Sequence, residues 1–180
     1  MSTPYHLVNV LTGTKGARLV EDPAQMARLI KRAERPLLIL GARTLTFTLD
    51  GRQLIEYALD IAQAGDIPIC ATAHTQKRVL ELGVTPDSTY DVIEIVNHLR
   101  DPDWQGVRKE GNHDLVIFVG FRTDLGNQAL STLKHFAPHL RTMTLCKYYY
   151  PNADHSLGNL KDDKWKEFLE GLIANLKEEE

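Results

Sequence analysis

Four short, mostly apolar runs after residue 20 constrain the fold most strongly. They are Leu37–Leu40, Ile67–Ala71, Leu115–Val119 and Thr142–Leu145. Apolar side chains at successive positions would bury both faces of a strand, which is typical of a parallel sheet covered on both sides. Gly41 and Gly120 directly follow the first and third runs and indicate tight turns there.

Stretches with helical periodicity separate the apolar runs. Asp22 followed by Pro23 is a typical helix start, and Ser88 with Asp91 resembles a capping box before another helix. The apolar positions at helical spacing are Met26, Leu29, Ile30 and Ala33; Leu54, Ala58 and Ile61; Val92, Val96 and Leu99; Ala129, Leu130 and Leu133; and Trp165, Phe168, Leu169, Leu172 and Leu176. The alternation predicts an α/β domain of three layers with a parallel sheet in the middle.

The length of 180 residues and a hydrophobic content of 43% suit one domain. We expect this domain to span residues 21–180, because residues 1–20 do not continue the pattern and would form an arm or an edge strand. The turn-forming residues of 100–113 predict a loop.

Composition argues against several classes of partner. The net charge of −3 gives no general attraction to nucleic acid or to an anionic membrane surface. No apolar stretch approaches the length of a membrane span, and the first residues lack the basic and apolar segments of a secretory signal. The sequence therefore predicts a cytoplasmic protein.

A binding site is expected where the predicted strands end, because ligands of open parallel sheets bind beyond the carboxyl ends of the strands. The candidate cofactor-binding residues there are Gly41, Arg43, Thr72, His74, Gly120, Arg122 and Asn152. Arginines beside helix N-termini favour a phosphate-bearing ligand such as a dinucleotide or coenzyme A. Alternatively, these residues are the polar loops and turn glycines of any α/β protein, and no G-x-G-x-x-G motif is present.

No convincing catalytic set emerges, and no metal site is predicted. Cys70 falls within a predicted strand, while Cys146 has only Lys147 beside it to lower its pKa. His135 and His139 are four residues apart, but Pro138 interrupts the helix that would align them. The two cysteines do not have the spacing of a zinc or iron–sulfur site.

Three aromatic residues are candidates for contact with a partner: Trp104, Tyr148 and Tyr149. Aromatic side chains are frequent anchors of protein interfaces. Trp104 lies in a polar loop, where it would either anchor an interface or cap the local core.

Several segments carry a resemblance to a known family. They are Arg35-Pro36-Leu37 leading to Gly41, Asp66-Ile67-Pro68-Ile69, Asp101-Pro102-Asp103-Trp104, Gly111-Asn112-His113-Asp114, Asn127-Gln128-Ala129-Leu130-Ser131, Asn152-Ala153 and Ser156-Leu157-Gly158-Asn159-Leu160. From about residue 20 onward, the sequence resembles the epsilon subunit family of the archaeal carbon monoxide dehydrogenase/acetyl-CoA synthase complex.

The resemblance implies a fold similar to the DHS-like NAD/FAD-binding domain of thiamine-diphosphate enzymes. It also implies a non-catalytic accessory subunit that stabilises a large nickel–iron–sulfur subunit in an α2ε2 assembly, where contact between two copies of the chain is plausible. No tightly bound cofactor is expected. The alternative is an FAD-binding electron-transfer module, although Ala73-His74 stand where the family pattern has a Gly-Ser type turn. A stand-alone enzyme of the same fold, such as an NAD-dependent deacetylase, is the least favoured hypothesis.

Overall fold

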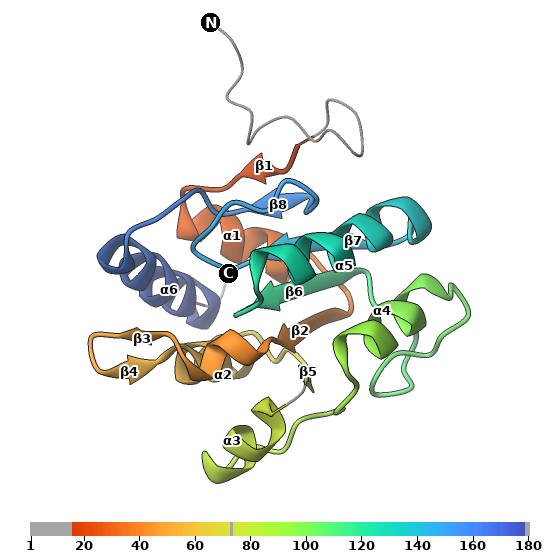
Figure 1. Cartoon of the computed structure of the whole chain (residues 1–180), viewed down its shortest axis with the longest axis horizontal. Coiled ribbons are helices and arrows are strands. Elements are labelled where there is room, and N and C mark those ends of the chain that lie inside the picture. The colour runs from red at the N-terminus through yellow and green to blue at the C-terminus, as the bar shows by residue number, and fades with distance from the viewer. Residues whose placement is uncertain (1–15, 73, 179–180) are drawn as a thin grey trace, which may run out of the picture.

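The computed structural model describes residues 16–72 and 74–178 and has a parallel six-stranded sheet at its centre (Figure 1). The strand order is β1-β8-β7-β6-β2-β5. The strands are β1 (Arg18–Leu19), β2 (Pro36–Leu40), β5 (Ile69–Ala71), β6 (Leu115–Val119), β7 (Arg141–Thr144) and β8 (His155–Ser156). The four apolar runs therefore correspond to β2, β5, β6 and β7, as expected. The two-residue strand β8 was not predicted, because two residues are too few to show a period, whereas β1 lies in the segment 1–20 for which an arm or an edge strand was expected.

Helices cover both faces of the sheet, which confirms the three-layer α/β prediction. They are α1 (Pro23–Lys31), α2 (Leu54–Ala64), α3 (Thr75–Glu81), α4 (Val92–Arg100), α5 (Thr123–Phe136) and α6 (Asp162–Lys177). Helices α1, α2 and α6 enclose one hydrophobic core, and α4 and α5 enclose a second core on the opposite face. A 3-10 helix η2 (Ala42–Leu45) and an antiparallel hairpin of β3 (Thr48–Leu49) and β4 (Arg52–Gln53) lie between β2 and α2.

Side-chain caps fix the starts of two helices. Asp22 caps α1 by accepting a hydrogen bond from the amide of Ala24, as the sequence predicts. Asp91 is the N-cap of α4 and accepts from the amides of Ile93 and Glu94. The expected capping box with Ser88 was wrong: Ser88 instead forms a parallel bridge beside β5.

The topology reverses between β2 and β6. The chain leaves β2 for β5 on one side and then crosses to β6 on the other side. Gly41 and Gly120 follow these two strands, and their backbones are so close that a Cβ added to Gly41 would lie 2.7 Å from the carbonyl carbon of Gly120. The amide of Gly41 also donates to the carbonyl of Val119 at 2.8 Å. The carboxyl ends of these central strands are therefore joined tightly.

One edge of the sheet is formed by β1, which pairs with β8. Of the 1–20 segment expected to be an arm or edge strand, residues 1–15 lie outside the described part of the chain.

In the described part, no helix is both long enough and apolar enough to cross a membrane.

Candidate functional site

A pocket of about 490 Å³ opens at the carboxyl end of the sheet, beside the point where the topology reverses. It is lined by Arg43, Phe47, Phe121, Arg122, Thr123, Asp124 and Tyr148. These residues come from η2 and the segment that follows it, from the loop after β6 with the first turn of α5, and from the segment after β7. The structure thus brings together two predicted cofactor-binding arginines and one predicted partner-binding tyrosine.

The two arginines of this pocket have different electrostatic surroundings. Arg122 forms a two-pronged ion pair with Asp124, through Nε at 3.1 Å and Nη2 at 2.6 Å. Asp124 accepts the Arg122 hydrogen bonds, which lower the pKa of its carboxyl group. Arg43 instead lies over the ring of Phe47 at 5.7 Å, and it has no ion-pair partner within residues 16–72 and 74–178. Arg43 is therefore the cation that is available to a ligand.

The backbone at the base of the pocket is already hydrogen-bonded. The amide of Arg43 donates to the carbonyl of Gly120 at 2.8 Å, and the amide of Thr44 donates to the carbonyl of Gly41 at 3.0 Å. The buried hydroxyl of Thr44 donates to the same Gly41 carbonyl. A phosphate group approaching the predicted glycines would have to displace these bonds, so side chains rather than backbone amides would hold an anion here.

The other predicted cofactor-binding residues do not line this pocket. Thr72 is buried, and its hydroxyl donates to the carbonyl of Leu40 at 2.6 Å. His74 is exposed at the start of α3, and its predecessor Ala73 lies outside the described residues. Asn152 is buried and donates to the backbone carbonyl of Asn127 in α5. The packing of Thr72 and Asn152 gives each a structural role.

Two of the three predicted partner-binding aromatics are engaged in local packing. Tyr149 is buried, and its hydroxyl donates to the carbonyl of Ala17. The half-buried ring of Trp104 stacks on His98 at 5.2 Å and packs against the α4/α5 core. Tyr148 differs from both because 43% of its surface is exposed.

Both cysteines of the chain are buried. Burial raises the pKa of the Cys70 thiol to about 11 and also raises the pKa of Cys146. Both cysteines are therefore neutral thiols near pH 7, and Lys147 is instead paired with Asp162 at 2.6 Å. Among the described residues, no group of three His, Cys, Asp or Glu side chains is placed to hold a metal ion.

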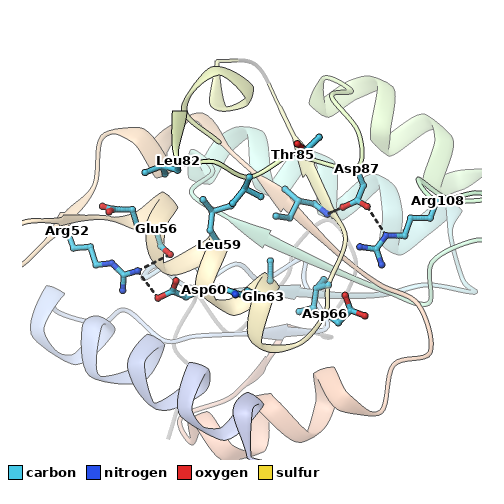
Figure 2. Close-up of a pocket in the computed structure, with 14 residues that line it drawn as sticks. Arg52, Glu56, Leu59, Asp60, Gln63, Asp66, Leu82, Thr85, Asp87 and Arg108 are labelled. Carbon is cyan, nitrogen blue, oxygen red and sulfur yellow. Dashed lines mark hydrogen bonds and ion pairs between the residues drawn. The ribbon is translucent and has the colours of Figure 1, made fainter. Parts of the chain in front are cut away.

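A groove of about 470 Å³, which the sequence did not predict, lies beside α2. Figure 2 shows the residues that line it. Two ion pairs border it: Arg52 with Asp60, and Arg108 with Asp87, each at 2.7 Å. Arg52 lies in β4, just before α2, and Asp60 lies within α2, so the two residues are eight positions apart in the chain and give only a weak sequence signal. Arg108 and Asp87 come from separate loops, so no local pattern could have indicated their pairing.

Comparison with known proteins gives a consistent result. The chain matches a family model described as CO dehydrogenase beta subunit/acetyl-CoA synthase epsilon subunit over residues 2–173. It is 41% identical over 165 residues to the epsilon subunit of the acetyl-CoA decarbonylase/synthase complex of Methanothermobacter thermautotrophicus, covering 92% of this chain and 91% of the relative. It is 38% identical to subunit epsilon 1 of that complex from Archaeoglobus fulgidus, covering 86% of this chain and 82% of the relative.

Proposed function

We propose, since this chain belongs to the family of CO dehydrogenase beta subunits and acetyl-CoA synthase epsilon subunits, that it is a non-catalytic accessory subunit of such a complex. Its role is to bind and stabilise the large nickel–iron–sulfur subunit in an α2ε2 assembly. The observation that carries the proposal is the similarity to named epsilon subunits over nearly the full length of both chains. The buried, neutral cysteines are consistent with a subunit that leaves the chemistry to its partner.

The carboxyl end of the sheet is the surface best suited to this partner. Tyr148 and Leu125 expose 43% and 37% of their surfaces there, beside the pocket that contains Arg43. Leu125 lies in the first turn of α5, adjacent to the pocket residue Asp124. Aromatic and arginine side chains at the centre of an interface commonly supply most of its binding free energy.

We expect Tyr148→Asp to weaken binding to the large subunit by about tenfold or more, because it places a charge in an apolar contact. The measurement is reconstitution of this chain with the large subunit of the same complex, followed by titration and by the thermal stability of the large subunit. The matched control is Phe136→Asp, since Phe136 is 61% exposed but ends α5 at the opposite, amino end of the sheet. Equal weakening by both substitutions would place the interface elsewhere. If the unmodified chain did not associate with the large subunit, that result would contradict the accessory role.

A second candidate function is FAD binding in the service of electron transfer, in a domain related to the NAD/FAD-binding domains of thiamine-diphosphate enzymes. The observation that favours it is the open pocket at the reversal of the topology, which combines Arg43 and Arg122 with the rings of Phe47 and Tyr148. Aromatic rings there could stack on a flavin or adenine ring, while Arg43 would meet a phosphate.

For this candidate, titration of the isolated chain with FAD should give a micromolar dissociation constant by flavin fluorescence. Arg43→Ala should weaken it by about tenfold, because one charge-assisted phosphate contact is lost. Arg28→Ala is the control, since Arg28 is an exposed arginine on α1. Absence of saturable binding, or the same loss with Arg28→Ala, would eliminate the FAD proposal and leave the accessory role intact.

A further inference from the structure

A separate pocket of about 340 Å³ lies at the amino end of the sheet, opposite the pocket that contains Arg43. Its wall is built from the carboxyl end of α1 and from the starts of β6 and β7, with β8 beside them. The apolar part of the lining includes Leu29 of α1 and the buried Met143 of β7. The polar part is dominated by basic side chains, namely Arg32, His139, Arg141 and His155.

His155 is the most unusual group in this pocket. It is only 8% exposed, and its Nδ1 atom has no hydrogen-bond partner in the described part of the chain. Leaving a buried polar nitrogen unsatisfied is costly, because the nitrogen loses its hydrogen bonds to water without gaining another partner. Because His155 pairs in register with Met143, both side chains point to the face of the sheet that α1 covers. The unsatisfied nitrogen therefore belongs to a residue that forms the pocket wall.

Charges of both signs lie near this imidazole. Burial lowers the pKa of His155; the charge of Asp154 acts against this, and the charges of Arg18 and Arg141 lower the pKa further. Arg32 and Arg141 are exposed, and neither has an ion-pair partner within residues 16–72 and 74–178. A bound anion would offset the repulsion from the arginines and favour the protonated form of His155.

The acidic group of the pocket, Asp114, forms no ion pair with Arg32 or Arg141 in the described part of the chain. Asp114 uses both carboxylate oxygens to accept hydrogen bonds from the amides of Glu34 and Arg35, at 2.9 and 2.7 Å. His139 contributes less, since its Nε2 already lies 3.1 Å from the carbonyl of Leu99. The carboxyl end of α1 carries partial negative charge, so an anion would depend on the two arginines for its attraction.

We propose that this pocket binds a small organic anion, with a carboxylate or phosphate group held by Arg32 and Arg141 and with the imidazole of His155 in the wall beside it. The apolar part of the ligand packs on Leu29 and Met143. The volume is within the range of small-molecule pockets, which begins at about 300 Å³. The proposal stands apart from the assignment as an accessory subunit and from the FAD pocket, because it uses neither surface.

The test is an NMR titration of the full chain, with the imidazole carbon–proton signals of its 7 histidines as the readout. The probes are phenyl phosphate, benzoate and inorganic phosphate. The signal of His155 should shift saturably with phenyl phosphate or benzoate, and its pKa should rise in the bound state because the anion favours the imidazolium. Inorganic phosphate should bind more weakly, since it lacks an apolar part.

Two variants separate this site from the opposite pocket. Arg141→Gln should weaken binding of the anion about tenfold through loss of a charge-assisted contact. The Arg141 side chain is exposed, so the substitution is compatible with folding. Arg43→Gln, the matched exposed arginine at the carboxyl end, should leave the His155 response unchanged. A His155 signal that never saturates, equal affinity in the Arg141→Gln chain, or weakening by Arg43→Gln would each overturn the proposal.

Discussion

Gly120→Ala is expected to destabilise the fold by about 3 kcal/mol or more, because it combines backbone strain with a steric clash. Gly120 has a φ of +70°, in the left-handed region that L side chains adopt at a cost. A Cβ at this position would also meet the side chain of Thr44 and would lie 2.5 Å from the Thr44 backbone nitrogen. Thr44 is fully buried and hydrogen-bonded to Gly41, so it cannot move aside without disturbing the contact between β2 and β6.

Gly83→Ala is the matched control for this prediction. Gly83 has a similar φ of +79°, but an added Cβ there would have nothing within 4 Å. Gly83→Ala should therefore lower the free energy of unfolding only by the backbone strain, about 1 kcal/mol. Urea unfolding followed by circular dichroism measures both free energies of unfolding. Equal losses in the two variants would show that the close approach of Gly120 to Thr44 contributes nothing.

Trp165→Ala is expected to lower the free energy of unfolding by about 3–5 kcal/mol, the usual range for removing a fully buried large aromatic side chain. Trp165 is 1% exposed, and its indole nitrogen donates to the carbonyl of Leu145 at 2.8 Å. Its ring meets Phe47 edge to face at 5.6 Å, and the Lys147 ammonium lies 5.9 Å from its centre. The substitution would thus leave both a cavity and an unpaired carbonyl group.

Trp104→Ala is the comparison, because the chain has only 2 tryptophans. Trp104 is half-buried and stacks on His98, so its removal should cost about 1–2 kcal/mol. The measurement is again urea unfolding followed by circular dichroism, which does not depend on tryptophan fluorescence. A larger loss from Trp104→Ala than from Trp165→Ala would contradict the assignment of Trp165 to the core beneath α6.

The sequence by itself determined the main elements of the sheet and its covering helices. Apolar residues on both faces of β2 and β6 required burial from two sides, and Asp22 set the start of α1 through a local hydrogen bond. These signals are readable because strand periodicity and helix capping act over a few neighbouring residues. The carboxyl-end loops followed from the same pattern, which is why Arg43 and Arg122 were predicted near a common site.

Only the tertiary structure decided which of those residues meet. Thr72 and Asn152 turn into hydrogen bonds with neighbouring elements, whereas Tyr148 joins the two arginines at the pocket. The burial of His155 gave no local signal, because it comes from a two-residue strand placed beside β7. Arg32 reaches the same pocket from the C-cap of α1, more than one hundred positions earlier in the chain. These contacts depend on strand order and helix packing, which bring together distant parts of the sequence. A local sequence pattern therefore does not indicate them.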